Sequence, residues 1–288
     1  MRIERFALPH HWYRKVQRFL MTHEAHNNLM LGLAGILMNS PETYPEFYLS
    51  EVIDEDAKTV GAALMTMPHH LIIAHGTSQE ALDLIATHTH RLYGTLPGVN
   101  SSRDLAEAFA RKWTEVSGVP HRRLMQQRIF QIDKVSMPEG AAGSLRLAGS
   151  ADIDLLAEWY AQFAIDATLP VPTPEQSRAW AEATAAAINR RAFLWIVDDK
   201  PVCLVGATGP TPNGIRIGPV YTPQDERRKG YGSACTAAVS QKMLDEGRRF
   251  CFLYTDIENP TSNKIYQNIG YRPIVDCDLY VFNASNPA

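Results

Sequence analysis

The chain has few cysteines and no long apolar segment. Its 288 residues include only Cys203, Cys235, Cys251 and Cys277, none spaced as CxxC. We therefore expect reduced thiols and not the disulfide framework of a small secreted domain. No apolar run approaches the roughly 20 residues of a membrane helix, and the N-terminus has no apolar signal core. These features predict a cytoplasmic protein with no membrane partner.

An excess of basic charge is also missing. The formal net charge is −3 and the isoelectric point is about 6.4, which disfavours proteins that hold nucleic acid through its phosphates. Histidines occur in pairs at 10–11 and 69–70 and at His88 and His90, without clustered Cys or carboxylate ligands. On a helix, residues two apart such as His88 and His90 face different sides. We expect neither a nucleic-acid partner nor a metal site.

Segments of alternating type suggest two domains of mixed α/β structure. A chain of this length favours two domains, and residues 136–144 are small, Gly- and Pro-containing and aperiodic, as in a linker. Before the linker, strands are predicted at 1–8, 46–54, 59–66, 70–74 and 122–134, and helices at 10–38, 78–92 and 102–116. After it, strands are predicted at 145–148, 193–197, 201–208, 216–221, 250–256 and 279–282, and helices at 151–165, 174–190, 230–247 and 259–268.

The two halves repeat the same order of elements. Asp56–Val60 and Asp198–Val202 are similar turns that each precede an apolar strand. This order favours tandem related domains at 1–135 and 145–288. Within the first half, Ser78 is expected to cap a helix. Residues 96–103 are expected to be the counterpart of the strand-to-helix junction that precedes residue 230 in the second half, but they lack its spacing and its basic run.

The informative segment of the second half is a basic loop that opens a helix. Arg227, Arg228 and Lys229 precede Gly230-Tyr231-Gly232, and the helix carries an apolar face of Tyr231, Cys235, Ala238, Val239 and Met243. The first turn of a helix has unsatisfied N–H groups and partial positive charge. Glycine lets a ligand approach the backbone. This loop alone is either a phosphate site or an ordinary solvated basic loop.

A second segment decides between these alternatives. The loop fits the pattern Gln/Arg-x-x-Gly-x-Gly/Ala at Arg227, Gly230 and Gly232. The pattern Asn-x-x-Ala-x-x-x-Tyr-x-x-x-Gly-Phe follows at Asn259, Ser262, Tyr266, Gly270 and Tyr271, with Ser for Ala and Tyr for Phe. These two spaced signatures resemble the GCN5-related N-acetyltransferase (GNAT) superfamily. The resemblance covers about residues 190–282, extends back to 144, and is only architectural over 1–135.

The resemblance implies a fold, a co-substrate and a set of site residues. Each half would be a mixed β-sheet flanked by helices, with 1–135 a degenerate copy. Acetyl-coenzyme A would be the co-substrate, its pantetheine arm lying between the parting strands 216–221 and 250–256. The residues that would bind it are Val220, Tyr221, Thr222, Arg227, Arg228, Lys229, Gly230, Tyr231, Gly232, Ser233, Asn259 and Asn263.

The implied chemistry is direct acetyl transfer to the amine of a small molecule or peptide. Tyr266 would give a proton to the leaving thiolate. The strand 215–221 contains no carboxylate, so the general base is not identified, and Asp256, Glu258 or a bridging water are weak candidates. The missing base leaves open a non-catalytic acetyl-coenzyme A sensor. An aminoacyl transferase that uses charged transfer RNA is disfavoured by the intact loop and the charge. A homodimer is also left open.

Overall fold

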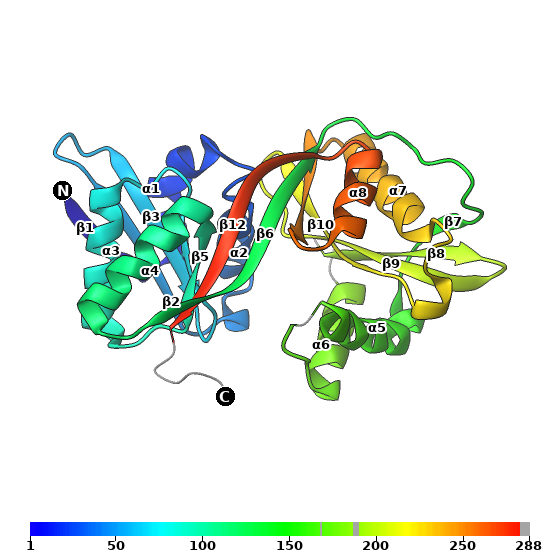
Figure 1. Ribbon diagram of the computed structural model, residues 1–288, viewed down its shortest axis with the longest axis horizontal. Helices are drawn as coiled ribbons and strands as arrows, with labels where there is room; N and C mark the ends of the chain where they lie inside the picture. The colour runs from blue at the N-terminus through cyan, green and yellow to red at the C-terminus, as the bar shows by residue number, and fades with distance from the viewer. Residues whose placement is uncertain (168, 187–189, 283–288) are drawn as a thin grey trace. The chain divides into compact units, whose positions relative to one another are not determined.

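The protein divides into two compact units in the computed structural model, which describes residues 1–167, 169–186 and 190–282 (Figure 1). Each unit is assembled from separate stretches of chain. The first comprises Met1–Ile129, Thr255–Asn259 and the described residues from Ile274 onward, and the second comprises Phe130–Tyr254 and Pro260–Pro273. No helix in the described ranges is long and apolar enough to cross a membrane.

The first unit is a mixed sheet with two pairs of helices. Its strands are hydrogen-bonded in the order β1-β2-β3-β4-β5-β12-β6. The strands are β1 (Arg2–Arg5), β2 (Phe47–Ile53), β3 (Thr59–Thr66), β4 (Leu71–Ile73), β5 (Gly98–Ser102), β6 (His121–Ile132) and β12 (Arg272–Phe282). The helices are α1 (Pro9–Met21), α2 (Asn28–Asn39), α3 (Gln79–Tyr93) and α4 (Arg103–Ser117), with a 3-10 turn η1 (Pro41–Thr43).

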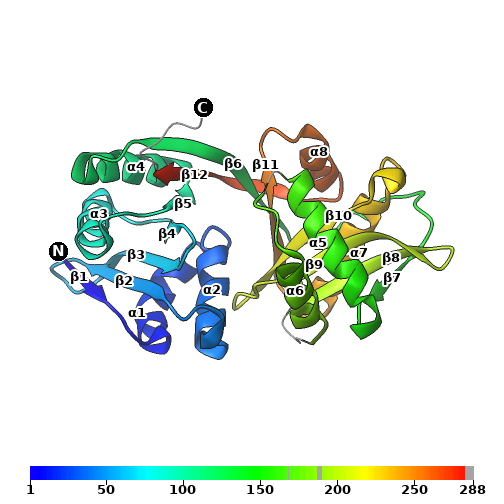
Figure 2. The ribbon, with the colours of Figure 1, turned by 90° about the horizontal axis from the view of Figure 1, so that it is seen from below.

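The helix pairs of the first unit cover opposite faces of its sheet. Successive side chains of a strand point to opposite faces. Leu49 and Leu64 accordingly pack in a cluster with residues of α1 and α2, whereas Tyr48 and Met65 pack with residues of α3 and α4. Figure 2 shows β2 and β3 between α1 and α2 on one side and α3 on the other. Two apolar clusters therefore hold this unit together.

The last strand, β12, completes the sheet of the first unit although it follows the whole second half in sequence. It pairs antiparallel with β5, with Cys277 opposite Ser102. Arg128 of β6 holds Asp276 of β12 through two hydrogen bonds of 2.6 and 3.0 Å. This pairing lowers the pKa of the Asp276 carboxyl. Bidentate arginine–carboxylate pairs combine energy with geometric specificity, so the pair helps to fix the register of β12.

The second unit is also a sheet covered on both faces by helices. Its strands follow the hydrogen-bonded order β11-β10-β9-β8-β7. They are β7 (Ser144–Leu147), β8 (Arg191–Val197), β9 (Lys200–Thr208), β10 (Gly214–Tyr221) and β11 (Phe250–Asp256). The helices are α5 (Ile153–Asp166), α6 (Pro174–Ala186), α7 (Tyr231–Asp245) and α8 (Pro260–Asn268), with 3-10 turns η2 (Ser150–Asp152) and η3 (Gln224–Glu226).

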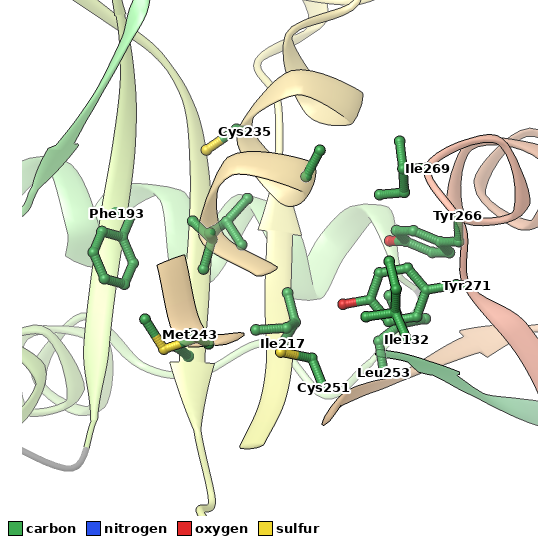
Figure 3. Packing of buried hydrophobic residues seen from close by; sticks show 14 of the residues in the cluster. Ile132, Phe193, Ile217, Cys235, Met243, Cys251, Leu253, Tyr266, Ile269 and Tyr271 are labelled. Carbon is green, nitrogen blue, oxygen red and sulfur yellow. The ribbon is translucent and has the colours of Figure 1, made fainter. Parts of the chain in front are cut away.

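The larger core of the second unit lies between the sheet and helices α7 and α8. Cys235, Val239 and Met243 of α7 are fully buried there, which confirms the predicted apolar face of this helix. Figure 3 shows Cys235 and Met243 of α7 together with Tyr266 and the neighbouring core residues. On the other face, residues of α5 and α6 form a separate cluster with residues of β8, β9 and β10. The mixed α/β class predicted from the sequence is confirmed.

Some predicted elements differ from the observed ones. The helical stretch 10–38 is two helices, α1 and α2, because residues 22–27 form turns. Residues 98–102 are a strand, and the final strand begins at Arg272 and not at 279. The expected linker packs within the second unit, where Trp195 Nε1 donates to the carbonyl of Ala142 at 2.9 Å. The division into domains 1–135 and 145–288 stays a prediction. The predicted helix end at 187–189 lies outside the described residues.

Candidate functional site

Strands β10 and β11 run parallel but pair over a short distance. Their register covers Gly214 with Phe250 through Arg216 with Phe252, and no further pair joins the described residues of these strands. On the β9 side, β10 has a bulge between Ile217 and Val220, within which the Gly218–Pro219 peptide is cis. Backbone groups near a protein core need hydrogen-bond partners. The far half of β10 can therefore receive a ligand that carries amide groups.

The loop that follows β10 is shaped for an anion. Gly230 has φ of 84° and Arg228 φ of 63°, in the left-handed region where glycine is favoured. Gly230 is the N-cap of α7 and provides no side-chain acceptor, and no acidic residue occupies the first turn. The free N–H groups of this turn can receive a phosphate. A Cβ on Gly232 would lie 3.4 Å from Thr222 Oγ1, so the glycine keeps this cradle open.

The cations of the loop differ in their partners. The Arg227 guanidinium donates from Nε to the carbonyl of Thr222 at 2.9 Å and from Nη2 to the carboxylate of Asp166. Lys229 pairs with Glu226 at 2.8 Å. The side chain of Arg228 is exposed. Arg227 therefore joins the end of β10 to the end of α5.

Tyr266 lies on α8 in the core of the second unit. Its ring is 6.0 Å from that of Tyr271, and Figure 3 shows the two hydroxyl groups directed the same way. The residue is 8% exposed. Burial, and secondarily Cys203, raises the pKa of Tyr266 well above its ordinary value. A phenol already carries its proton at neutral pH, as a proton donor must, and this shift makes the proton harder to remove.

Cys203 of β9 is a neighbour of the site that sequence reasoning missed. Thr222 Oγ1 donates a hydrogen bond to Cys203 Sγ at 3.4 Å, and Cys203 is fully buried. Thr222 is thus held through its carbonyl by Arg227 and through its hydroxyl by Cys203. The structure brings Thr222, Arg227 and Gly232 close together. Val220, Tyr221, Tyr231 and Ser233 adjoin them along β10 and α7, and the coenzyme contacts of all these residues stay predictions.

The second signature is divided between the units. Asn263 lies on α8 in the second unit, whereas Asn259 and the base candidates Asp256 and Glu258 lie in Thr255–Asn259 of the first unit. The Asp256 carboxylate accepts from the backbone N–H of Glu258 at 2.8 Å. This contact closes a local turn. The cofactor contacts of Asn259 and Asn263 and the catalytic role of either acid stay predictions.

The equivalent place in the first unit is closed by its own side chains. There β4 pairs parallel with β5, as β10 does with β11, and residues 74–78 lead into α3. Ser78 Oγ accepts from the N–H of Ala81 at 3.2 Å, as predicted, and Ser101 Oγ donates to the carbonyl of Ile73 at 2.9 Å. Residues 96–103, which the sequence analysis placed at this junction, instead contain β5 and lead into α4. That the first unit is a degenerate copy stays a prediction.

Three histidines distant in sequence meet in the first unit. The rings of His23, His26 and His75 have centroids 4.4–5.4 Å apart. Burial and the other two rings lower the pKa of His26 to about 4. No group of three His, Cys, Asp or Glu residues within the described parts of the chain is arranged to hold a metal ion. No spacing rule could reveal this cluster, because the residues come from two separate turns.

Solved structures show the same fold over both units. A Drosophila protein aligns over 98% of this chain and 98% of its own, with TM-score 0.68 and 10% identity. A GNAT-family acetyltransferase from Colwellia psychrerythraea aligns over 98% of this chain and 100% of its own, with TM-score 0.58 and 12% identity. A GCN5-related N-acetyltransferase from Kribbella flavida covers 78% of this chain and 88% of its own, with TM-score 0.56 and 16% identity. No curated protein sequence matches the chain.

A family model matches much of the second half of the chain. Residues 144–272 match a family described as Acetyltransferase (GNAT) domain. That range holds β8 to β11, the loop before α7 and helix α8, and therefore the whole of the site in the second unit. Residues 144–272 of this chain are therefore a GNAT acetyltransferase domain.

Proposed function

We propose that the protein transfers the acetyl group of acetyl-coenzyme A to the amine of a small molecule or peptide. The observation that carries this proposal is the early end of β10–β11 pairing, followed by a left-handed loop at the start of α7. An amide-bearing arm fits the first feature and a pyrophosphate fits the second. The GNAT domain at residues 144–272 supports acetyl transfer in general, and the arrangement of these residues supports this co-substrate.

The roles of the residues follow from their chemistry. The N–H groups of the first turn of α7, from Tyr231 to Ser233, bind the pyrophosphate. Acetyl-coenzyme A would supply a reactive thioester when it is bound. Tyr266, whose phenol carries its proton at neutral pH, provides a proton for the departing sulfur. No carboxylate lies on β10, so we assign deprotonation of the amine to water.

The test is a comparison of binding with turnover. Coenzyme A is titrated by calorimetry, and thiol release from acetyl-coenzyme A is measured with a panel of small and peptide amines. We expect micromolar binding and amine-dependent thiol release by the wild-type protein. Gly232→Phe should abolish binding, because its side chain would fill the space beside Thr222 Oγ1, 3.4 Å from a Cβ at this position, and thermal unfolding shows whether the variant is folded. Binding without turnover on any amine would favour a sensor, and no binding would refute the proposal.

A further inference from the structure

Asp166 stands at an unfavourable place in its helix. It is the last residue of α5, and no basic residue lies in the last turn of that helix. The C-terminal end of a helix carries partial negative charge, so a carboxylate there is repelled. Neither the GNAT signatures nor the apolar pattern of α5 requires this acid. A positively charged partner from outside the helix would therefore stabilise the Asp166 carboxylate.

That partner is Arg227, the arginine of the loop signature. Asp166 accepts from its Nη2, and the side chains are 31% and 41% exposed respectively. The same guanidinium donates from Nε to the carbonyl of Thr222. A guanidinium has five N–H donors, so these two contacts leave three donors for another acceptor. Arg227 is thus held in one orientation at two points and keeps donors for a ligand.

We propose that Asp166 is a positioning residue for coenzyme binding, which orients Arg227 toward the pyrophosphate. This inference rests on the proposed function. Arginine side chains have many rotamers, and fixing one before binding removes part of the entropic cost of ordering it. Because the second anchor is the carbonyl at the end of β10, the pair also fixes the start of the loop. Asp166 acts through Arg227 and does not itself touch the coenzyme.

The first test separates the pyrophosphate from the remainder of the coenzyme. Asp166→Asn is expected to weaken coenzyme A binding about three- to tenfold, the range for one charge-assisted contact. The KM for S-acetylpantetheine, which lacks the pyrophosphate, should not change. The matched control is Asp154→Asn, because Asp154 lies on the same helix and pairs with Arg178 at 2.7 Å. The control should bind coenzyme A as the wild type does.

A double-mutant cycle tests whether the effect passes through the arginine. Arg227→Gln should weaken coenzyme A binding at least as much as Asp166→Asn, and adding Asp166→Asn to it should cause no further loss. Unchanged affinity of Asp166→Asn, additive losses in the double variant, or an equal loss for S-acetylpantetheine would each overturn the inference. If the wild type does not bind coenzyme A, the proposed function fails first. Thermal unfolding of each variant shows whether it is folded.

Discussion

Replacing Gly230 with alanine is the sharpest test of the loop, because the free-energy cost of this substitution is conformational and not steric. Its φ is 84°, and the nearest atom to a Cβ placed there is Ala141 Cβ at 3.6 Å. Gly230→Ala therefore has space for its methyl group but must either keep a left-handed backbone or shift the loop. The left-handed conformation costs a non-glycine residue about 1–2 kcal/mol. If the loop shifts in the free protein, coenzyme A affinity should fall about 5- to 30-fold.

The control for Gly230→Ala lies at the other end of the same helix. Gly247 has φ of 96°, and a Cβ on it would have no atom within 4 Å, so Gly247→Ala carries the same conformational cost just beyond the end of α7. Calorimetry with coenzyme A and urea unfolding should be measured for both variants. We expect comparable losses of stability but reduced affinity only for Gly230→Ala. Wild-type affinity of Gly230→Ala, or equal losses for Gly247→Ala, would refute the assignment of the loop.

Three further predictions concern chemistry and stability. Tyr266→Phe should lower steady-state turnover by about 100-fold, the lower range for a general acid, with calorimetric coenzyme A affinity unchanged; wild-type turnover would exclude the acid role. Asp276→Asn should lower the free energy of unfolding in urea by about 1–2 kcal/mol. Arg128 lowers the pKa of Asp276 in the folded protein. The stabilisation is therefore present above the unfolded-state pKa of about 3.9 and is lost as pH falls through the folded-state pKa. An equal effect of the substitution below the folded-state pKa would contradict this reasoning.

The histidine cluster predicts acid sensitivity. The pKa of His26 is about 4 in the folded protein and about 6.5 when unfolded, so only the unfolded chain gains its proton between these values. Stability should therefore fall by about 1–2 kcal/mol as pH decreases from 6.5 to 4, allowing for solvent screening of the partly exposed ring. His26→Gln should reduce that slope in urea unfolding measured across this range, and an unchanged slope would contradict the reasoning.

The elements that sequence analysis identified are those specified by neighbours along the chain. The apolar face of α7 repeats every three or four residues, and Ser78 lies next to the helix that it caps, so both can be predicted from neighbouring residues in the sequence. The strand at 98–102 was missed because only Val99 has strong β-propensity. The membership of β12 in the first unit depends on its pairing with β5, and no local pattern encodes such a distant partner.

The same distinction between contacts local in sequence and distant contacts applies to the candidate site. The loop was located from a signature that is contiguous in sequence. The residues that support the loop could not be located in this way, because Asp166 is 61 residues from Arg227 and Cys203 is 19 residues from Thr222. An acid at the end of a helix is a weak signal that could have drawn attention to Asp166. A buried thiol that accepts one hydrogen bond leaves no signal in the sequence.

The position of β12 has a consequence for how the chain folds during its synthesis. Strand β6 ends at Ile132 and β12 begins at Arg272, so about 140 residues are added before the sheet of the first unit can be completed. At about 5–20 residues per second, the ribosome needs roughly 7–28 seconds for that stretch. Over this interval β5 lacks the partner that it has in the finished protein, and exposed strand edges invite pairing with other chains. Most of the first unit is thus synthesised first, but its sheet is completed last. The nascent chain is most prone to aggregate in this interval.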